Sequence, residues 1–189
     1  MSEPGQERSI LSVINIPNTL TIARIVIIPV FVTAIIYAKY DYALYLFVVA
    51  MLTDLLDGLF ARLADQKTEL GTFLDPLADK FLLVTSFILF SLYGWIPKWL
   101  AVTIISRDLI VVIGWVLLSL IFHRSKVEPV LLGKAAIASQ LLLLAYILLS
   151  LTQPSIPPVP KVFVMLTAGL TALSGIQYIY KGLKQANAA

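Results

Sequence analysis

Six long apolar segments run through the chain, and short polar connections separate them. Each holds about 20 mostly apolar residues, the length that an α-helix needs to cross a bilayer. The expected spans are Thr21–Tyr40, Tyr42–Arg62, Leu70–Tyr93, Trp99–Phe122, Pro129–Leu151 and Val162–Lys181. Because backbone groups inside a bilayer must be hydrogen-bonded within the protein, this pattern predicts an all-α integral membrane protein, a six-helix transmembrane bundle.

The polar parts of the chain outside these spans are short. Residues 1–20 form an N-terminal segment with prolines at 4 and 17, and no cleavable signal peptide is evident there. Within it, Arg8–Ile14 could form a short helix at the membrane surface. The proline-rich stretch Gln153–Pro160 predicts an extended loop. Residues 21–182 are therefore expected to be the transmembrane domain, and residues 183–189 a C-terminal tail.

Composition supports the membrane assignment. Of the 189 residues, 59% are hydrophobic and 13% are charged, and the mean hydropathy is +0.92. A soluble domain of this size has a different balance. Cysteine is absent from the sequence, which excludes disulfides and thiolate chemistry. The net charge of +3 is modest, and in so apolar a chain the basic residues are expected to set the membrane topology and to contact anionic lipid. No nucleic-acid partner is expected.

The basic residues predict an orientation. If both termini are cytoplasmic, eight basic residues lie on that side and three lie outside, which agrees with the positive-inside rule. The cytoplasmic set is Arg8, Arg62, Lys67, Arg124, Lys126, Lys134, Lys181 and Lys184. The outer set is Lys39, Lys98 and Lys161.

Four aspartates stand at the ends of two neighbouring spans. Asp54 and Asp57 are three residues apart, and Asp75 and Asp79 are four apart, so each pair shares a helical face. The short connection Leu63–Glu69 makes the two helices antiparallel neighbours, and their carboxylates can converge. Clustered carboxylates in partly dehydrated space need cations, and ligands that are all oxygen suit Mg²⁺ or Mn²⁺.

Other interpretations of these acids remain open. Arg62, Lys67 and Lys80 could neutralise one or two of them in a purely structural protein. Intramembrane acids also mark the ion paths of proton and cation transporters. Small residues favour a binding site, because Gly58, Ala61 and Gly71 would leave room for a phosphate beside the carboxylates; close helix packing is the other reading of these glycines.

The spacing of these residues resembles a known signature. The pattern D-x-x-D-G-x-x-A-R, eight further residues, and G-x-x-x-D-x-x-x-D is similar to that of the CDP-alcohol phosphotransferase family at every fixed position. Those positions are Asp54, Asp57, Gly58, Ala61, Arg62, Gly71, Asp75 and Asp79.

The resemblance implies a membrane enzyme that transfers a phosphatidyl group from CDP-diacylglycerol to an alcohol and releases CMP. It implies two Mg²⁺ or Mn²⁺ ions held by Asp54, Asp57 and Asp75, with Asp79 as a further ligand and as the catalytic base. The nucleotide-binding residues it implies are Thr21, Asp57, Gly58, Ala61, Arg62 and Gly71. It also implies a homodimer and a bacterial inner membrane, and the orientation predicted from the basic residues puts the active site toward the cytoplasm.

The acceptor alcohol is harder to predict. The stretches "NIPNTLTIARIVIIPVF", "LGKAAIASQ" and "SGIQYIYKG" resemble phosphatidylglycerophosphate synthases, which use glycerol 3-phosphate. "LTDLLDGLFAR" and "ISRDLIVV" resemble cardiolipin synthases, which use phosphatidylglycerol. Glycerol 3-phosphate is placed first, phosphatidylglycerol second, and inositol phosphate or serine further behind.

The chain departs from the first pattern where acceptor-side cations are expected. Trp115 stands where a second arginine is usual, and Ala136 and Ile137 replace lysine–threonine. Arg107 and Lys134 remain as the candidate acceptor-binding residues. Arg107 and Asp108 point about 100° apart on a helix, so they are expected to have separate partners.

Small residues in the last span give some support to a homodimer. Gly169, Ala172 and Gly175 could let two helices approach closely, either between chains or within one bundle.

Overall fold

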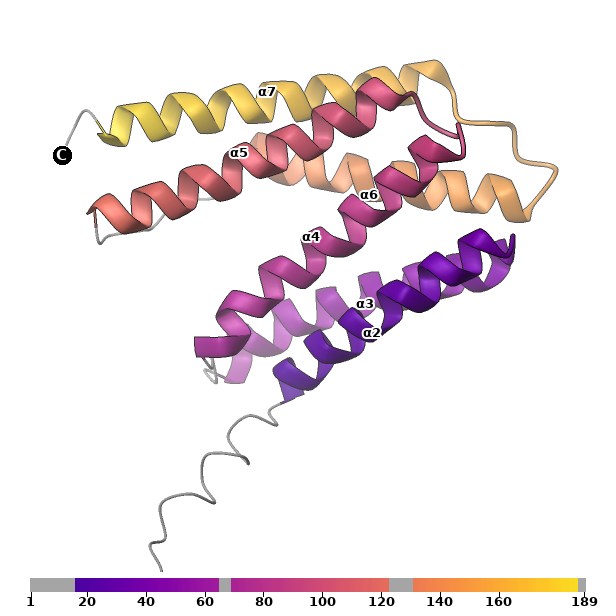
Figure 1. Cartoon of the computed structure of the whole chain (residues 1–189), viewed down its shortest axis with the longest axis horizontal. Helices are drawn as coiled ribbons and strands as arrows, with labels where there is room; N and C mark the ends of the chain where they lie inside the picture. The colour runs from indigo at the N-terminus through magenta and orange to yellow at the C-terminus, as the bar shows by residue number, and fades with distance from the viewer. Residues whose placement is uncertain (1–15, 65–68, 123–130, 187–189) are drawn as a thin grey trace, which may run out of the picture. The chain divides into compact units, whose positions relative to one another are not determined.

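The computed structural model describes residues 16–64, 69–122 and 131–186, with side chains over 25–53, 80–114 and 131–184. Six helices make up most of the described chain (Figure 1). They are α2 (Ile16–Ile36), α3 (Tyr40–Ala64), α4 (Glu69–Leu92), α5 (Lys98–Phe122), α6 (Leu131–Thr152) and α7 (Lys161–Ala186). Each expected span corresponds to one helix, which confirms the all-α class. The proposed interfacial helix at Arg8–Ile14 lies outside the described residues.

The first helix is shifted relative to its expected bounds. It begins at Ile16 rather than Thr21 and ends at Ile36 rather than Tyr40. The end is set by Ala38, which has a left-handed φ of 53°. The backbone amide of Ala38 donates to the carbonyl of Ile35 (3.0 Å), and that of Lys39 donates to Ala34 (2.8 Å). This is the Schellman arrangement that closes many helices, here without the usual glycine.

The end of α4 uses the same arrangement with a glycine. Gly94 has a φ of 77°, and its amide donates to Ser91 (3.3 Å) while that of Trp95 donates to Phe90 (2.9 Å). The rings of Trp95 and Phe90 lie 5.1 Å apart between centroids, the apolar contact that commonly accompanies this motif. A glycine reaches positive φ without steric cost, so Gly94 is a favourable residue for ending a helix. The helix ends at Leu92, one residue before the expected end at Tyr93.

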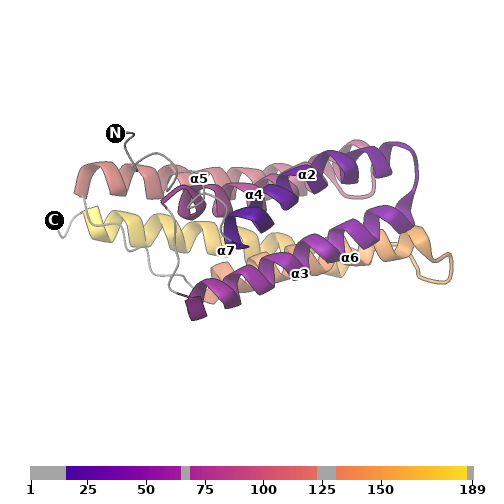
Figure 2. The same cartoon turned by 90° about the horizontal axis from the view of Figure 1, so that it is seen from below.

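The chain divides into two compact units, residues 1–85 and 86–189. In the first unit α2 packs against α3, and their shared core contains Phe31, Ile35, Ala43, Phe47 and Ala50. The rings of Phe31 and Phe47 are 6.3 Å apart between centroids. Figure 2 shows the chain turning from α2 directly into α3. The short side chains of Ala43 and Ala50 are buried and allow the two helices to pack closely.

In the second unit α7 packs against both α5 and α6 (Figures 1 and 2). Many of its core side chains come from α5 and α6, and these include Leu100, Ile104, Leu143, Leu144, Ile147 and Leu148. Between α6 and α7, Gln153–Pro160 is non-helical as expected. The Tyr146 hydroxyl donates to the carbonyl of Pro157 (3.1 Å), which ties this loop to α6.

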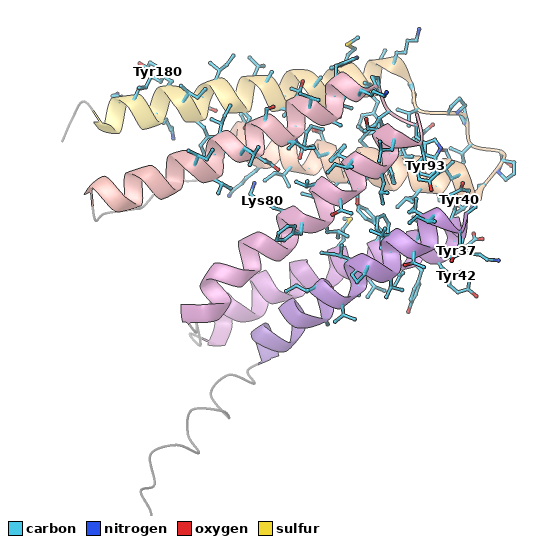
Figure 3. The ribbon with its side chains drawn as sticks, viewed as in Figure 1. Tyr37, Tyr40, Tyr42, Lys80, Tyr93 and Tyr180 are labelled. Atoms are coloured by element: carbon cyan, nitrogen blue, oxygen red, sulfur yellow. The ribbon has the colours of Figure 1, made fainter. Side chains whose placement is uncertain are left out.

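The structure is consistent with a membrane protein. Within the described chain, α6 and the Lys161–Lys184 part of α7 are long and apolar enough to cross a bilayer. Tyrosines gather at the connection between α2 and α3, where Figure 3 shows Tyr37, Tyr40 and Tyr42. The side chains of Tyr37 and Tyr42 are 72% and 67% exposed, as is typical of residues at a membrane–water boundary.

Candidate active site

The four signature aspartates lie on two helices. Asp54 and Asp57 belong to α3, and Asp75 and Asp79 belong to α4. Because both segments are helical, the two aspartates of each pair, three or four residues apart, share one face of their helix. Their side chains, and residues 65–68 between the helices, lie outside the described part of the structure. The convergence of the carboxylates and their binding of metal remain predictions.

The candidate nucleotide-binding residues lie on the same helices and on α2. Thr21 is in α2, while Gly58, Ala61 and Arg62 are in α3 and Gly71 is in α4. All five positions fall within the first unit, as do the four aspartates. Their side-chain contacts also lie outside the described residues, so their roles remain predictions.

Arg107 of α5 is a buried cation that makes three side-chain hydrogen bonds. Its residue is 4% exposed, and its guanidinium donates from Nε (3.2 Å) and from Nη2 (2.6 Å) to the Ser174 hydroxyl on α7. Its Nη1 donates to the Asp108 carboxylate at 2.7 Å. Arg107 therefore joins α5 to α7 while its charge is neutralised locally.

The expectation that Arg107 and Asp108 do not pair with each other is wrong, although Arg107 does have a second partner in Ser174. The helical-wheel angle describes where the Cα–Cβ bonds point, but an arginine side chain is long enough to reach back to its neighbour. Burial favours this pairing, because an unpaired charge away from water costs far more free energy than a paired one. Asp108, which is 5% exposed, benefits in the same way.

Two glycines and a tyrosine complete the surroundings of Arg107. The Tyr178 ring lies 5.3 Å from the guanidinium carbon, within cation–π range. A Cβ on Gly133 would meet the Tyr178 hydroxyl at 2.9 Å and Arg107 Nη2 at 3.3 Å, and one on Gly175 would meet Arg107 Cγ at 3.3 Å. We call these six residues the Arg107 cluster: Arg107, Asp108, Gly133, Ser174, Gly175 and Tyr178.

The cluster changes the interpretation of the small residues on α7. Gly175 faces Arg107 inside the unit, so it provides no surface for a second chain. Gly169 and Ala172 are exposed. Of the two alternatives for these residues, packing within one bundle therefore holds for Gly175.

The second acceptor candidate is in a different environment. Lys134 is the fourth residue of α6, follows Gly133 and is exposed. Of the two departures from the synthase pattern nearby, Ala136 is fully buried and Ile137 is 39% exposed. Trp115 lies on α5, but its side chain is outside the described residues.

Sequence reasoning missed Ser174 and Tyr178. The signal was present in α7, where Thr167, Thr171, Ser174 and Tyr178 follow each other at intervals of four, three and four residues. Polar side chains at this spacing share one face, and in an apolar helix such a face turns toward the protein interior. Thr171 confirms this, because its hydroxyl accepts a hydrogen bond from the Gln140 amide of α6 (3.0 Å).

Comparison with known proteins decides the family. The model of the CDP-alcohol phosphatidyltransferase family matches residues 14–173. The chain belongs to this family. The matched region contains all eight signature positions and Arg107, and the membership confirms the expected class of enzyme, a phosphatidyltransferase of phospholipid biosynthesis.

Relatives carry names from both branches considered above. A probable phosphatidylglycerophosphate synthase of Mycobacterium tuberculosis H37Rv is 35% identical over 190 residues, covering 96% of this chain and 88% of the relative. The CDP-diacylglycerol–glycerol-3-phosphate 3-phosphatidyltransferase of Bacillus subtilis is 36% identical over 110 residues, covering 50% and 56%. The human cardiolipin synthase (CMP-forming) is 34% identical over 189 residues, covering 89% and 62%.

Proposed function

We propose that this protein transfers a phosphatidyl group from CDP-diacylglycerol to sn-glycerol 3-phosphate, giving phosphatidylglycerophosphate and CMP. The family match over residues 14–173 carries the proposal. Support for this acceptor comes from the M. tuberculosis relative, which is similar along nearly the whole of both chains. The B. subtilis relative, which is named for the same acceptor, supports it over half of this chain.

The donor set fits divalent metal. The four candidate ligands are all carboxylates: Asp54 and Asp57 on α3, and Asp75 and Asp79 on α4. The two residues of each pair share one face of their helix. These residues would hold two Mg²⁺ or Mn²⁺ ions. Such ions, when bound, neutralise diphosphate oxygens and the charge that develops on the leaving group.

The remaining steps fall to the protein's own residues. Asp79 takes the proton from the acceptor hydroxyl, and that oxygen attacks the phosphorus bearing the diacylglycerol. The bond from this phosphorus to the bridging oxygen breaks, and CMP leaves with the electron pair. Arg62, with Thr21, Gly58, Ala61 and Gly71, binds the nucleotide, since a guanidinium suits a pair of phosphate oxygens.

The proposal includes the placement of the chain in its membrane. The six helices α2 to α7 cross a bacterial inner membrane, both termini and the active site face the cytoplasm, and the enzyme is a homodimer. The excess of eight basic residues over three on one side supports this orientation.

Arg107 and Lys134 bind the acceptor in this proposal. The three hydrogen bonds of Arg107 use three of its five N–H donors, which leaves two that can bind a phosphate oxygen pair. Lys134 is exposed and can approach the same anion as a mobile charge.

One observation favours phosphatidylglycerol as a second candidate acceptor. Asp108 lies 2.7 Å from Arg107 and cancels its charge, so the pair adds little net positive potential. Glycerol 3-phosphate carries up to two negative charges, whereas the phosphodiester of phosphatidylglycerol carries one. A site of low positive charge suits the second better.

An acceptor panel tests the proposal. Purified enzyme receives labelled CDP-diacylglycerol and Mg²⁺ with glycerol 3-phosphate, phosphatidylglycerol, inositol phosphate or serine, and the lipid product is identified. We expect phosphatidylglycerophosphate and an equal amount of CMP. Turnover with phosphatidylglycerol alone would replace the first acceptor by the second, and no CMP release with any acceptor would overturn the proposed transfer.

A variant pair tests the role of the aspartates. Asp79→Asn removes one carboxylate of the set, and we expect it to abolish turnover while the protein stays folded. Asp41→Asn is the matched control, because Asp41 is an exposed acid in the first turn of α3 and should keep its activity when changed. Normal turnover in Asp79→Asn would remove the base assignment, and ion flux through sealed vesicles without CMP release would favour a transporter.

A further inference from the structure

A single buried hydroxyl on another helix accepts two hydrogen bonds from Arg107. Ser174 of α7 is fully buried, and its Oγ accepts from both Nε (3.2 Å) and Nη2 (2.6 Å) of the guanidinium. Two bonds from one edge of a planar group to the same atom restrict rotation of that plane more than one bond does.

The other contacts of Arg107 do not replace this function. Asp108 is the next residue on α5, so its 2.7 Å bond neutralises the charge and holds Nη1 but does not link the guanidinium to α7. The Tyr178 ring lies 5.3 Å from the guanidinium carbon, and a face contact of this kind tolerates sliding. Ser174 is therefore the directional contact between the guanidinium and α7.

Space around the Arg107 side chain is also restricted. A Cβ at Gly175, the neighbour of Ser174, would lie 3.3 Å from Arg107 Cγ. A Cβ at Gly133 would lie 3.3 Å from Arg107 Nη2. The two glycines let the backbones of α6 and α7 approach the arginine closely, so its side chain has little freedom to adopt another orientation.

We propose that Ser174 is a positioning residue that aims the remaining N–H donors of Arg107 at the acceptor, so that α7 contributes to acceptor binding. This rests on the proposed function, in which Arg107 binds the phosphate of the acceptor. A guanidinium that tilts loses one of the two parallel hydrogen bonds to a phosphate. Ser174 should therefore affect the binding of the acceptor and leave the CDP-diacylglycerol site unchanged.

Steady-state kinetics of Ser174→Ala separates this role from a structural one. We expect the KM for glycerol 3-phosphate to rise about 10- to 100-fold, while the KM for CDP-diacylglycerol changes less than about twofold. Ser174→Thr keeps an oxygen at the same position and should restore part of the acceptor KM. Thermal unfolding of each variant in detergent reports whether the fold is retained.

Thr171→Val is the matched control. Thr171 is also fully buried on α7, and its hydroxyl bonds to Gln140 rather than to Arg107. This variant should lose a comparable amount of stability without a selective rise in the acceptor KM. If Ser174→Ala and Thr171→Val change both KM values alike, Ser174 is structural and the proposal is wrong.

The outcome also distinguishes this proposal from the proposed function. If the wild type uses only phosphatidylglycerol, the choice of glycerol 3-phosphate fails, but a selective rise in the phosphatidylglycerol KM in Ser174→Ala would still support positioning by Ser174. If the wild type turns over no phosphate-bearing acceptor, both fail, since Arg107 then has no acceptor phosphate to bind.

Discussion

Replacing Gly133 by alanine tests whether the Arg107 cluster is as tightly packed as its distances indicate. The added Cβ would lie 2.9 Å from the Tyr178 hydroxyl, 3.0 Å from Tyr178 Cε2 and 3.3 Å from Arg107 Nη2. Two of these separations are at or below the shortest that real Cβ atoms show. Tyr178 or Arg107 must move, and Arg107 is held by Ser174 and Asp108.

The expected cost follows from two opposing effects. Crowding a packed site typically costs about 1–3 kcal/mol. Glycine to alanine within a helix recovers about 0.5–1 kcal/mol, and less here because Gly133 is the third residue of α6. We therefore expect Gly133→Ala to lower the free energy of unfolding by about 1–2 kcal/mol, which for a chain of this length is a fall in Tm of about 2–8 °C.

Thermal unfolding in detergent measures this effect. The control is Gly169→Ala, because Gly169 is a mid-helix residue of α7 with nothing within 4 Å of a built Cβ, and it should raise the Tm slightly. Tyr178→Phe removes the hydroxyl, so in a double-mutant cycle it should recover part of the loss. The reasoning is refuted if Gly133→Ala is as stable as Gly169→Ala.

Two further predictions concern described contacts, and a third concerns the proposed metal site. Ala38→Gly should raise the free energy of unfolding by about 1 kcal/mol, because Ala38 has a φ of 53°, and a thermal shift without loss of activity would confirm it. Asp108→Asn should cost about 3–5 kcal/mol by leaving the charge of Arg107 buried and uncompensated, and chemical denaturation in detergent would show whether the loss is this large. In the fraction that folds, it should also raise kcat/KM for glycerol 3-phosphate relative to phosphatidylglycerol. Chelation of divalent metal should abolish CMP release, and adding back Mg²⁺ or Mn²⁺ should restore it.

The six helices could be predicted because their signal is long and continuous. Runs of about 20 apolar residues leave few alternatives, and the bounds of α5 are within one residue of those expected. The bounds of α2 were harder to predict from the sequence. Its end depends on Ala38 adopting a left-handed φ, which alanine rarely does, whereas Gly94 at the end of α4 is a recognisable signal.

The Arg107 cluster could not be predicted from spacing, because its partners come from three helices. Arg107 is on α5, Gly133 on α6 and Ser174 on α7, so only the packing of these helices brings them together. The polar face of α7 was visible in the sequence, but it offers Thr167, Thr171 and Ser174 alike. The choice among them depends on the helix register, which a single sequence does not contain.

The pairing of Arg107 with Asp108 also changes how acceptor charge is inferred. By sequence alone, Arg107 carries a full positive charge. Ala136 and Ile137, which replace lysine–threonine, then only reduce the number of basic residues near the acceptor. With the Asp108 carboxylate 2.7 Å away, Arg107 contributes directed hydrogen bonds rather than net potential. The exposed Lys134 is then the main source of net positive charge among the two acceptor candidates. Discrimination between a monoester and a diester therefore depends on the charge of the Arg107–Asp108 pair, and Asp108→Asn changes that charge while the Ser174 hydroxyl can still accept from Arg107.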